Sequence, residues 1–395
     1  MNNNFKTYIF QTGHGKGLAK MELMSIMGKE PIDETEDGFV IECEITHARQ
    51  LIDRMGGAVR ITEVVSAAPA EMPINFTELV AKAIASEVKV GGKIRFGLSM
   101  HPKSDKVLKN ILINTKKLLK GKIGNIRFVN KDFQNLSSVQ AWHENLLGEN
   151  AIELQLFKSE TKWYVAKTIA IQDFENYAFR DMKRPAKDLQ NGMFPPKLAQ
   201  ILINLAAPKL SQDFTIFDPF CGSGTVLQEA ILMGFSAAGS DFDPKMFSDS
   251  GENLKWLIDK FKLEGEEPKV FLKDATELTK ADLPKQPFAI VTETWLGQMI
   301  SRTPTEEQIE RIQSIAEKIY ADFFDNLKRI LPAGTVMVFT APYHKIGNDR
   351  YFLEKLPKIL EKNCKILPLS EHERPSLFYE RKDQYVGREI WKLTW

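Results

Sequence analysis

Apolar and polar positions along the chain alternate in short segments, and their pattern changes near residue 195. The N-terminal part begins as strand, helix, strand, helix, strand, with apolar runs such as TYIFQTG and GFVIECEI. Alternating elements of this length are typical of a small α+β domain, which we expect at residues 1–68. A second α+β domain is expected at residues 69–172, ending in two strands, 151–159 and 162–170, that we predict form a hairpin.

The C-terminal part carries a different pattern. After a polar stretch at residues 173–194, which we interpret as a linker, helical and strand patterns alternate repeatedly through residues 195–395. This alternation is typical of βαβ units and predicts an α/β domain with a parallel sheet. Strands are expected at 214–217, 236–241, 269–274, 288–293 and 335–342, and the tail segments 364–369 and 389–395 are expected to close the sheet as an antiparallel pair.

The long helix after the fourth strand has a recognisable start. We expect Thr303 as its N-cap, Pro304 at the first helical position and Glu306 completing a capping box.

Composition limits the classes of function. The chain has 395 residues, is 43% hydrophobic and has a net charge of +1, so a polyanionic partner must be met by a local patch. It has no apolar run of about 18 residues, and its start resembles no secretory signal, so we expect no membrane span and a cytoplasmic protein. The three cysteines form no C-x-x-C pair, and we expect no metal site.

A glycine turn follows the first strand of the C-terminal part. It reads DPFCGSGT, residues 218–225, and leads directly into a helix. The ends of the first four strands carry Asp218, Asp241, Asp274 and Glu293. Ligands of an open α/β sheet bind at the carboxyl ends of its strands, so these acids point to a ligand site.

The spacing of the acids indicates a nucleoside ligand. Asp241 lies 23 residues after Asp218, close to the spacing of an acid that binds ribose hydroxyls. Leu227 stands where a dinucleotide fingerprint needs its third glycine, and no G-K-[ST] phosphate loop is present. An acid in front of the turn repels a pyrophosphate and favours a cation, such as the amino group and sulfonium of S-adenosylmethionine (SAM).

A second charged feature lies in the N-terminal part. Between His101 and Lys131 nine cations stand against one acid, Asp105, which describes either a solvated helix face or a phosphate-binding patch. The nearby Phe96, Phe128 and Phe133 are expected in the core. The residues assigned to RNA binding here are Lys106, Lys109, Lys116, Lys117, Lys120, Lys122 and Arg127.

Two further arginines, Arg180 and Arg184, lie in RDMKRP just before the C-terminal domain. They are added to the RNA-binding set because arginine can clamp phosphate bidentately. Pairing with Asp181 and Asp188, which would fix the linker, is equally open.

Several segments resemble one enzyme family. DPFCGSGT is similar to motif I of amino-methyltransferases. The segments 178–206, 163–181 and 379–390 resemble, in order, the part before motif I, the end of the THUMP domain and the last hairpin of THUMP-domain tRNA guanosine-N2 methyltransferases. This resemblance implies a Rossmann-like SAM methyltransferase domain preceded by an RNA-binding region made of a ferredoxin-like and a THUMP-like part.

The resemblance also implies a SAM site. Its turn would surround the methionine moiety, its second and third strand ends would hold ribose and adenine, and Cys221 would be a small packing residue rather than a nucleophile. The residues it assigns to the cofactor are Phe194, Pro195, Asp218, Cys221, Gly222, Ser223, Gly224, Asp241, Phe242, Asp274, Ala275 and Thr292.

The catalytic residues are expected at the tip of the fourth strand. Methylating an exocyclic amine requires acceptors that hold the amine, and a base taken out of an RNA helix stacks on an aromatic ring. The family places Asp/Asn-Pro-Pro-Tyr here, whereas this chain has Glu293, Thr294 and Trp295. Glu293 and the carbonyl of Thr294 would accept from the amine, and Trp295 would stack on the base.

The predicted function is therefore SAM-dependent methylation of the N2 amine of a guanosine in tRNA. Two alternatives remain, a catalytically inactive RNA-binding relative and an N6-adenine methyltransferase. Beyond tRNA, a small activator subunit is a further possible partner, as in some members of the family.

Overall fold

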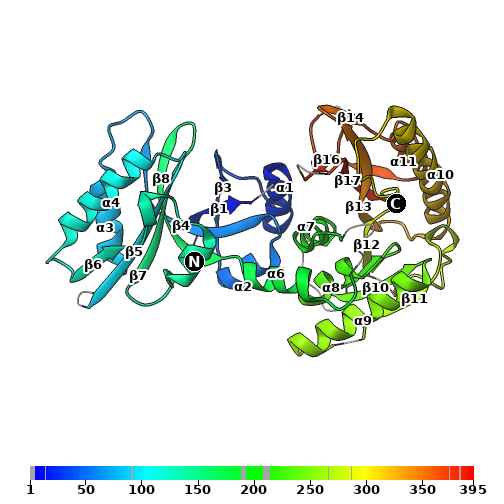
Figure 1. Ribbon diagram of the computed structural model, residues 1–395, viewed down its shortest axis with the longest axis horizontal. Helices are drawn as coiled ribbons and strands as arrows, with labels where there is room; N and C mark the ends of the chain where they lie inside the picture. Colours follow the sequence, from blue (N-terminus) through cyan, green and yellow to red (C-terminus); the bar gives the residue numbers. More distant parts are fainter. Residues whose placement is uncertain are drawn as a thin grey trace. The chain divides into compact units, whose positions relative to one another are not determined.

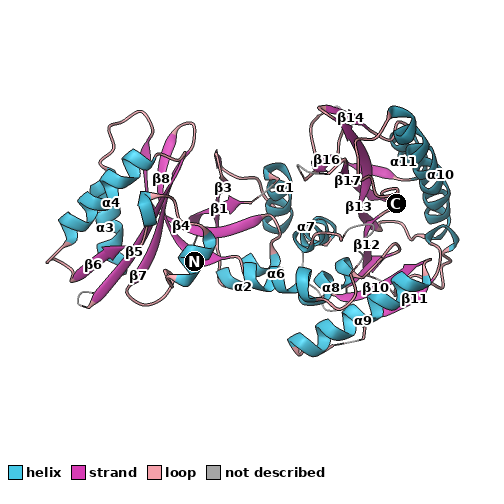
Figure 2. Cartoon of the chain, viewed as in Figure 1, coloured by secondary structure: helices cyan, strands magenta, loops and turns pink. Residues whose placement is uncertain are grey.

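The computed structural model describes residues 5–13, 15–89, 92–187, 193–207, 214–265, 267–285, 287–372, 374–381 and 384–395. The chain forms two compact units (Figures 1 and 2). The first contains residues up to Lys20 together with Met27–Phe174, and the second contains Met21–Ile26 together with Glu175–Trp395. Each unit is built around a sheet of its own.

The first unit contains one eight-stranded sheet of order β2-β3-β1-β4-β8-β7-β5-β6. Its central strand β4 pairs with β1 on one side and with β8 on the other, so the two predicted N-terminal domains share a continuous sheet. The predicted hairpin is confirmed, since β7 and β8 pair in antiparallel register. The strands are β1 (Lys6–Thr12), β2 (Asp33–Thr35), β3 (Gly38–Cys43), β4 (Ala58–Pro69), β5 (Lys93–His101), β6 (Asn125–Phe128), β7 (Ala151–Lys158) and β8 (Lys162–Ile171).

Helices α3 and α4 pack against strands β5 to β8 of this sheet. Their apolar faces share one buried core with strands β5 to β8, because Val80 and Ile84 of α3 and Leu108 and Leu112 of α4 are fully buried there. The charged side of α4 therefore faces outward. The helices of the first unit are α1 (Lys16–Met27), α2 (Ala48–Arg54), α3 (Phe76–Glu87), α4 (Asp105–Leu119), α5 (Ser138–His143) and the short η1 (Lys131–Phe133).

The second unit contains a nine-stranded sheet whose main path is β11-β10-β9-β12-β13-β17-β15. The first five strands of this path are parallel, as predicted, and β17 runs antiparallel to both β13 and β15, which confirms the closing pair. The strand order reverses direction between β9 and β12. The strands are β9 (Thr215–Asp218), β10 (Ser236–Asp241), β11 (Lys269–Leu272), β12 (Phe288–Glu293), β13 (Val336–Ile346), β14 (Asp349–Tyr351), β15 (Lys365–Leu367), β16 (Leu377–Tyr379) and β17 (Val386–Thr394).

Helices pack on this sheet through apolar stripes at helical spacing. In the longest of them, α10, Ile309, Ala316, Phe323 and Leu327 are fully buried, as the periodicity predicts. The ring of Phe323 meets Phe220 of the glycine turn edge to face, which joins the core to the site above it. The helices of this unit are α6 (Phe174–Lys183), α7 (Pro196–Ala206), α8 (Thr225–Leu232), α9 (Pro244–Phe261), α10 (Glu306–Ile330), α11 (Leu356–Asn363) and η2 (Ala275–Glu277).

The predicted start of α10 is wrong by two residues. Thr305, rather than Thr303, is the N-cap, and it forms a reciprocal capping box with Gln308 in which both bonds are 3.0–3.2 Å long. The sequence RTPTEEQ contains two overlapping matches to the capping-box pattern, and the sequence alone does not rank them. The hydroxyl of Thr303 instead lies 3.3 Å from that of Tyr385.

The predicted linker is also partly wrong, because most of its first half is helix α6. The segment FENYAFRDMK alternates polar and buried positions, and Tyr177 and Arg180 lie on its buried side. Its polar composition comes from the opposite face, which explains why composition alone suggested a linker. Residues 188–192 of the predicted linker lie outside the described residues. None of the helices within the described ranges combines the length and the apolar character needed to cross a membrane.

The corrected cap gives a direct prediction. Thr305→Ala removes the side chain that accepts from the amide of Gln308, which costs about 1 kcal/mol of local stability. Amide hydrogen exchange in the first turn of α10 should therefore become about fivefold faster. Thr303→Ala is the matched control and should leave this exchange unchanged. Faster exchange in Thr303→Ala than in Thr305→Ala would instead identify Thr303 as the N-cap.

Candidate functional site

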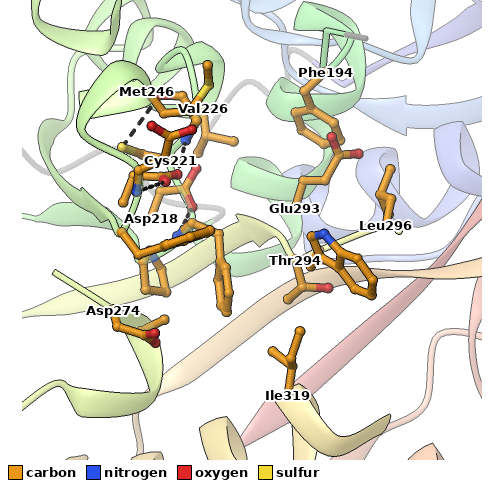
Figure 3. Close-up of a pocket in the computed structure, with 18 of the residues that line it drawn as sticks. Phe194, Asp218, Cys221, Val226, Met246, Asp274, Glu293, Thr294, Leu296 and Ile319 are labelled. Carbon is orange, nitrogen blue, oxygen red and sulfur yellow. Dashed lines mark hydrogen bonds between the residues drawn. The ribbon is translucent and has the colours of Figure 1, made fainter. Parts of the chain in front are cut away.

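A cavity of about 560 Å³ opens at the carboxyl edge of the second sheet, where β9, β10, β11 and β12 end (Figure 3). The reversal of strand order between β9 and β12 is the position where open α/β sheets bind ligands. Twelve of the residues predicted for the site line the cavity, namely Phe194, Asp218, Cys221, Gly222, Ser223, Asp241, Phe242, Asp274, Ala275, Glu293, Thr294 and Trp295.

The glycine turn is fixed by its own backbone. The amide of Cys221 donates to the carbonyl of Ser240 on the neighbouring strand, at 2.9 Å. Gly224 has a φ of 85°, and a Cβ at this position would stand 2.7 Å from the hydroxyl of Ser250. Glycine is therefore required here by both conformation and space. Gly224 does not line the cavity and contributes by shaping the turn.

Asp218 is an acid held in its neutral form. Only 2% of its surface is exposed, and its Oδ1 accepts from the amide of Phe220 and from the hydroxyl of Thr292. Burial raises the pKa of Asp218 to about 8, and the nearby acids Asp241 and Glu293 add to this effect. In the protein without ligand the side chain is therefore mostly protonated at neutral pH.

Thr292 supports this acid and does not reach the ligand. Its side chain is fully buried, and it does not line the cavity. The prediction that Thr292 contacts the cofactor is therefore wrong. Successive side chains of a strand point to opposite faces, so Glu293, the next residue on β12, faces the cavity and Thr292 does not. Its hydroxyl instead donates to Asp218.

Asp241 lies at the end of β10 and locks the turn from the other side. Its Oδ2 accepts from the amide of Gly222 at 2.9 Å, and its Oδ1 accepts from the amide of Asp243 at 3.0 Å. Burial raises the pKa of Asp241 as well. Next to it the ring of Phe242 is 67% exposed and lines the cavity, so it offers an open aromatic face.

Asp274 lies two residues beyond the end of β11, because this strand is shorter than predicted. It caps the short helix η2, and its Oδ1 accepts from the amide and the hydroxyl of Thr276. Figure 3 shows Asp274, Asp218 and Cys221 on one side of the cavity and Glu293, Phe194 and Leu296 on the other.

Glu293 forms an ion pair that the sequence did not suggest. The Nε of Arg388, on β17, donates to Oε1 of Glu293, and the Arg388 side chain is only 8% exposed. The guanidinium carbon of Arg388 also lies 5.7 Å from the centre of the Phe194 ring. The cation thus contacts both the acid and the aromatic wall of the same side of the cavity.

Thr294 anchors the turn after β12. Its side chain is buried, and its hydroxyl bonds to the carbonyl of Thr340 at 2.6 Å and to the hydroxyl of Tyr320. The Tyr320 hydroxyl also reaches the carbonyl of Trp295 at 3.5 Å. These bonds restrict the backbone of the turn that follows β12.

Two remaining cofactor predictions concern residues that shape the site. Pro195 is buried, serves as the N-cap position of α7 and does not line the cavity. Cys221 lines the cavity but is 5% exposed, and burial raises the pKa of its thiol well above the usual value. Such a thiol is not a nucleophile at neutral pH, which fits a packing role.

The assignment of Arg180 and Arg184 to RNA binding is wrong. Arg180 is 7% exposed and forms a bidentate pair with Glu229 at 2.7 and 3.0 Å. Arg184 is 2% exposed and donates to Thr225 and to Asp181, so one of the predicted partners is found. The other predicted partner, Asp188, lies outside the described residues. Both side chains are therefore buried, Arg180 on the inner face of α6 and Arg184 just after the end of this helix.

The seven cations predicted in the first unit are all exposed, and five of them lie on α4 or at its end. Lys109 lies 4.9 Å over the Phe133 ring and Lys116 lies 5.7 Å over the Phe128 ring. Both rings also pack against the core, as expected. Arg127 is 3.3 Å from Glu144, which reduces its availability to a phosphate.

Several residues of the cavity were not predicted. Ile319 and Asp322 reach it from α10, and Leu296 and Gly297 continue the wall after Trp295. No sequence signal links Arg388 to Glu293, because 95 residues separate them and the pairing of β17 with β13 brings them together. Among the described residues no group of three or more His, Cys, Asp or Glu side chains is arranged to hold a metal ion.

Comparison with known proteins gives matches along the second unit and beyond. Residues 183–366 match the family model described as RMKL-like, methyltransferase domain. Residues 100–251 match a model described as DNA methylase. The first of these ranges contains the glycine turn and the strand that carries Glu293.

Two curated relatives are named tRNA (guanine(10)-N2)-dimethyltransferase. The one from Methanothermobacter thermautotrophicus is 31% identical over 185 residues, which are 46% of this chain and 48% of the relative. The one from Methanocaldococcus jannaschii is 31% identical over 169 residues, which are 41% of this chain and 44% of the relative. The matched part thus spans about half the length of each of these relatives.

Two solved structures resemble nearly the whole chain. TrmN from Thermus thermophilus has a TM-score of 0.50 at 13% identity, covering 98% of this chain and 99% of its own. A possible methylase from Clostridium difficile 630 has a TM-score of 0.51 at 14% identity, covering 98% of each chain. At such identity the likeness concerns the fold, and the α/β fold class predicted from the sequence is confirmed.

Proposed function

We propose that the second unit transfers a methyl group from SAM to the exocyclic N2 amine of a guanosine in tRNA. The observation that carries this proposal is the cavity that joins a nucleoside site to a carboxylate and an aromatic ring. The curated relatives that bear this activity in their names add support, and their names make guanosine 10 the first position to examine.

The donor set fits SAM. Asp218 and Asp241 offer carboxylates to the ammonium and the ribose hydroxyls, and Asp274 lies where the adenine edge would lie. The open ring of Phe242 offers a face for adenine. When bound, SAM supplies an electrophilic methyl group on a sulfonium.

The remaining steps belong to residues of this chain. Glu293 and the carbonyl oxygen of Thr294 accept hydrogen bonds from the two N–H groups of the amine, which turns the nitrogen lone pair toward the methyl group. Trp295 stacks on the base and helps to exclude water from the site. Arg388 holds one oxygen of Glu293, so the carboxylate keeps one orientation while its other oxygen meets the amine.

The first unit would bring the tRNA to this site. Its exposed cations on α4 form a phosphate-binding surface in this proposal, in keeping with a THUMP-like part. In this proposal the reaction takes place in the cytoplasm.

The test uses the full chain, labelled SAM and unmodified tRNA transcripts, followed by digestion to nucleosides. Label in N2-methylguanosine or its dimethyl form is the expected result. Label in methyladenosine would support the N6-adenine alternative, and SAM binding without transfer would support the inactive relative. If transfer then appears on adding a small subunit from the same organism, an activator is required.

Glu293→Ala should lower the transfer rate at least about 100-fold, because the amine loses its charged acceptor. The affinity for SAM should stay within about threefold, since Glu293 lies across the cavity from the glycine turn. Glu293→Gln is the matched control for the buried Arg388, because it keeps an acceptor for the guanidinium. Wild-type rates in both variants would show that the acceptor lies elsewhere.

Asp218 gives the site a predictable pH dependence. A carboxyl group with a pKa of about 8 must lose its proton to pair with the ammonium of SAM, so binding releases one proton below this pH. Affinity measured by calorimetry should rise about tenfold per pH unit between pH 5.5 and 7.5. Asp218→Asn should bind more weakly and without this slope. A flat profile for the unaltered protein would show that Asp218 does not ionise on binding.

A further inference from the structure

A second cavity of about 620 Å³ adjoins the first. Trp295 lines both of them, and the chain passes directly from one to the other. The walls of the second cavity are the segment that leads to α10 and the outer face of the first turns of this helix. They consist of Trp295, Gln298, Met299, Ile300, Ser301, Arg302, Thr303, Pro304, Thr305, Gln308, Arg311, Ile312 and Ile315.

The charged side chains that line this cavity are both cations. Arg302 and Arg311 line it, and none of the other described lining residues carries a carboxylate. Both arginines are exposed, and neither forms an ion pair with a carboxylate in the part of the chain that the structure describes. The cavity is thus complementary to an anionic group.

The other walls suit a planar, partly polar group. Met299 and Ile315, which are 57% and 46% exposed, add apolar surface to the lining. Gln298 and Ser301 add an amide and a hydroxyl to the same lining. Apolar contact, hydrogen-bonding side chains and two cations together match the base, the sugar and the phosphate of a nucleotide.

We propose that this second cavity receives the nucleotide next to the target guanosine in the RNA strand. The inference rests on the proposed function, because it assumes that the first cavity holds the target base. A base taken out of a helix brings its flanking phosphates with it, so the strand must continue past Trp295. Arg302 and Arg311 then contact a flanking phosphate, and Trp295 separates the two bases.

The test compares Arg302→Ala, Arg311→Ala and the double variant with the unaltered protein. The measurements are kcat, the KM for a tRNA transcript over a series of KCl concentrations, and the affinity for SAM. Each single variant should raise the KM about tenfold, which is typical for loss of one charged hydrogen bond. The slope of log(kcat/KM) against log[KCl] should become shallower by about 0.7 for each arginine. The affinity for SAM should not change.

Lys269→Ala is the matched control. Lys269 is an exposed cation at the first residue of β11, at the opposite edge of the sheet from both cavities. Its loss should change neither the KM for tRNA nor the salt slope. An equal effect of this variant would mean that the arginines act only through the overall charge.

Ile315→Trp tests the cavity without changing charge. A bulky ring at this exposed position fills the space and should raise the KM for tRNA while leaving the salt slope as it is. Unchanged KM values and slopes in all three arginine variants, with transfer intact, would overturn the subsite and leave the proposed function standing. Absence of transfer to any tRNA by the unaltered protein would instead overturn the proposed function and this inference with it.

Discussion

The ion pair between Arg388 and Glu293 is the interaction on which the geometry of the site depends. Of the acids at this edge of the sheet, Asp218, Asp241 and Glu293 are each stabilised by a different means. Asp218 is neutral because it is buried, and Asp241 accepts backbone amides of the turn. Only Glu293 receives a full counter-charge among the three, and that charge arrives from β17. The last strand, β17, therefore supplies the cation that holds Glu293 at the end of β12.

In the proposed reaction, this ion pair would take over the role of the proline that amino-methyltransferases carry at this position. Glutamate is longer than aspartate and has one more rotatable bond, so alone it would be less well oriented. Arg388 removes that freedom by holding one oxygen and by stacking over Phe194. The hydroxyl of Thr294, bonded to Thr340 and Tyr320, restrains the following turn. In the proposed site, contacts from β13, α10 and β17 would thus compensate for these two differences from the amino-methyltransferase motif.

The features that could be predicted from the sequence are those that follow from its repeating pattern of strands and helices. The strand ends follow from the βαβ pattern, because parallel strands must bring their carboxyl ends to one edge, and this is why Asp218, Asp241 and Glu293 were found. Features that depend on distant partners were not predicted. Arg388 reaches Glu293 only through the pairing of β17, and Arg180 is buried because Glu229 lies opposite it. The second cavity likewise arises from a loop folded against α10.

Local ambiguity accounts for the other differences. Overlapping capping patterns made Thr303 and Thr305 indistinguishable, and strand alternation placed Thr292 behind the cavity rather than in it. In the first unit the pattern correctly gave the elements, but it could not show that β4 joins them in one sheet. Sheet pairing over long sequence separations is the step that a linear pattern does not contain.

The most direct measurement is the structure of the protein with S-adenosylhomocysteine and a tRNA substrate. The account predicts the N2 atom of an extruded guanine about 3 Å from the oxygen of Glu293 that Arg388 leaves open, and about 3 Å from the carbonyl oxygen of Thr294. The base should lie against Trp295. A base bound away from Glu293, or an amine held by Asp218 instead, would contradict it.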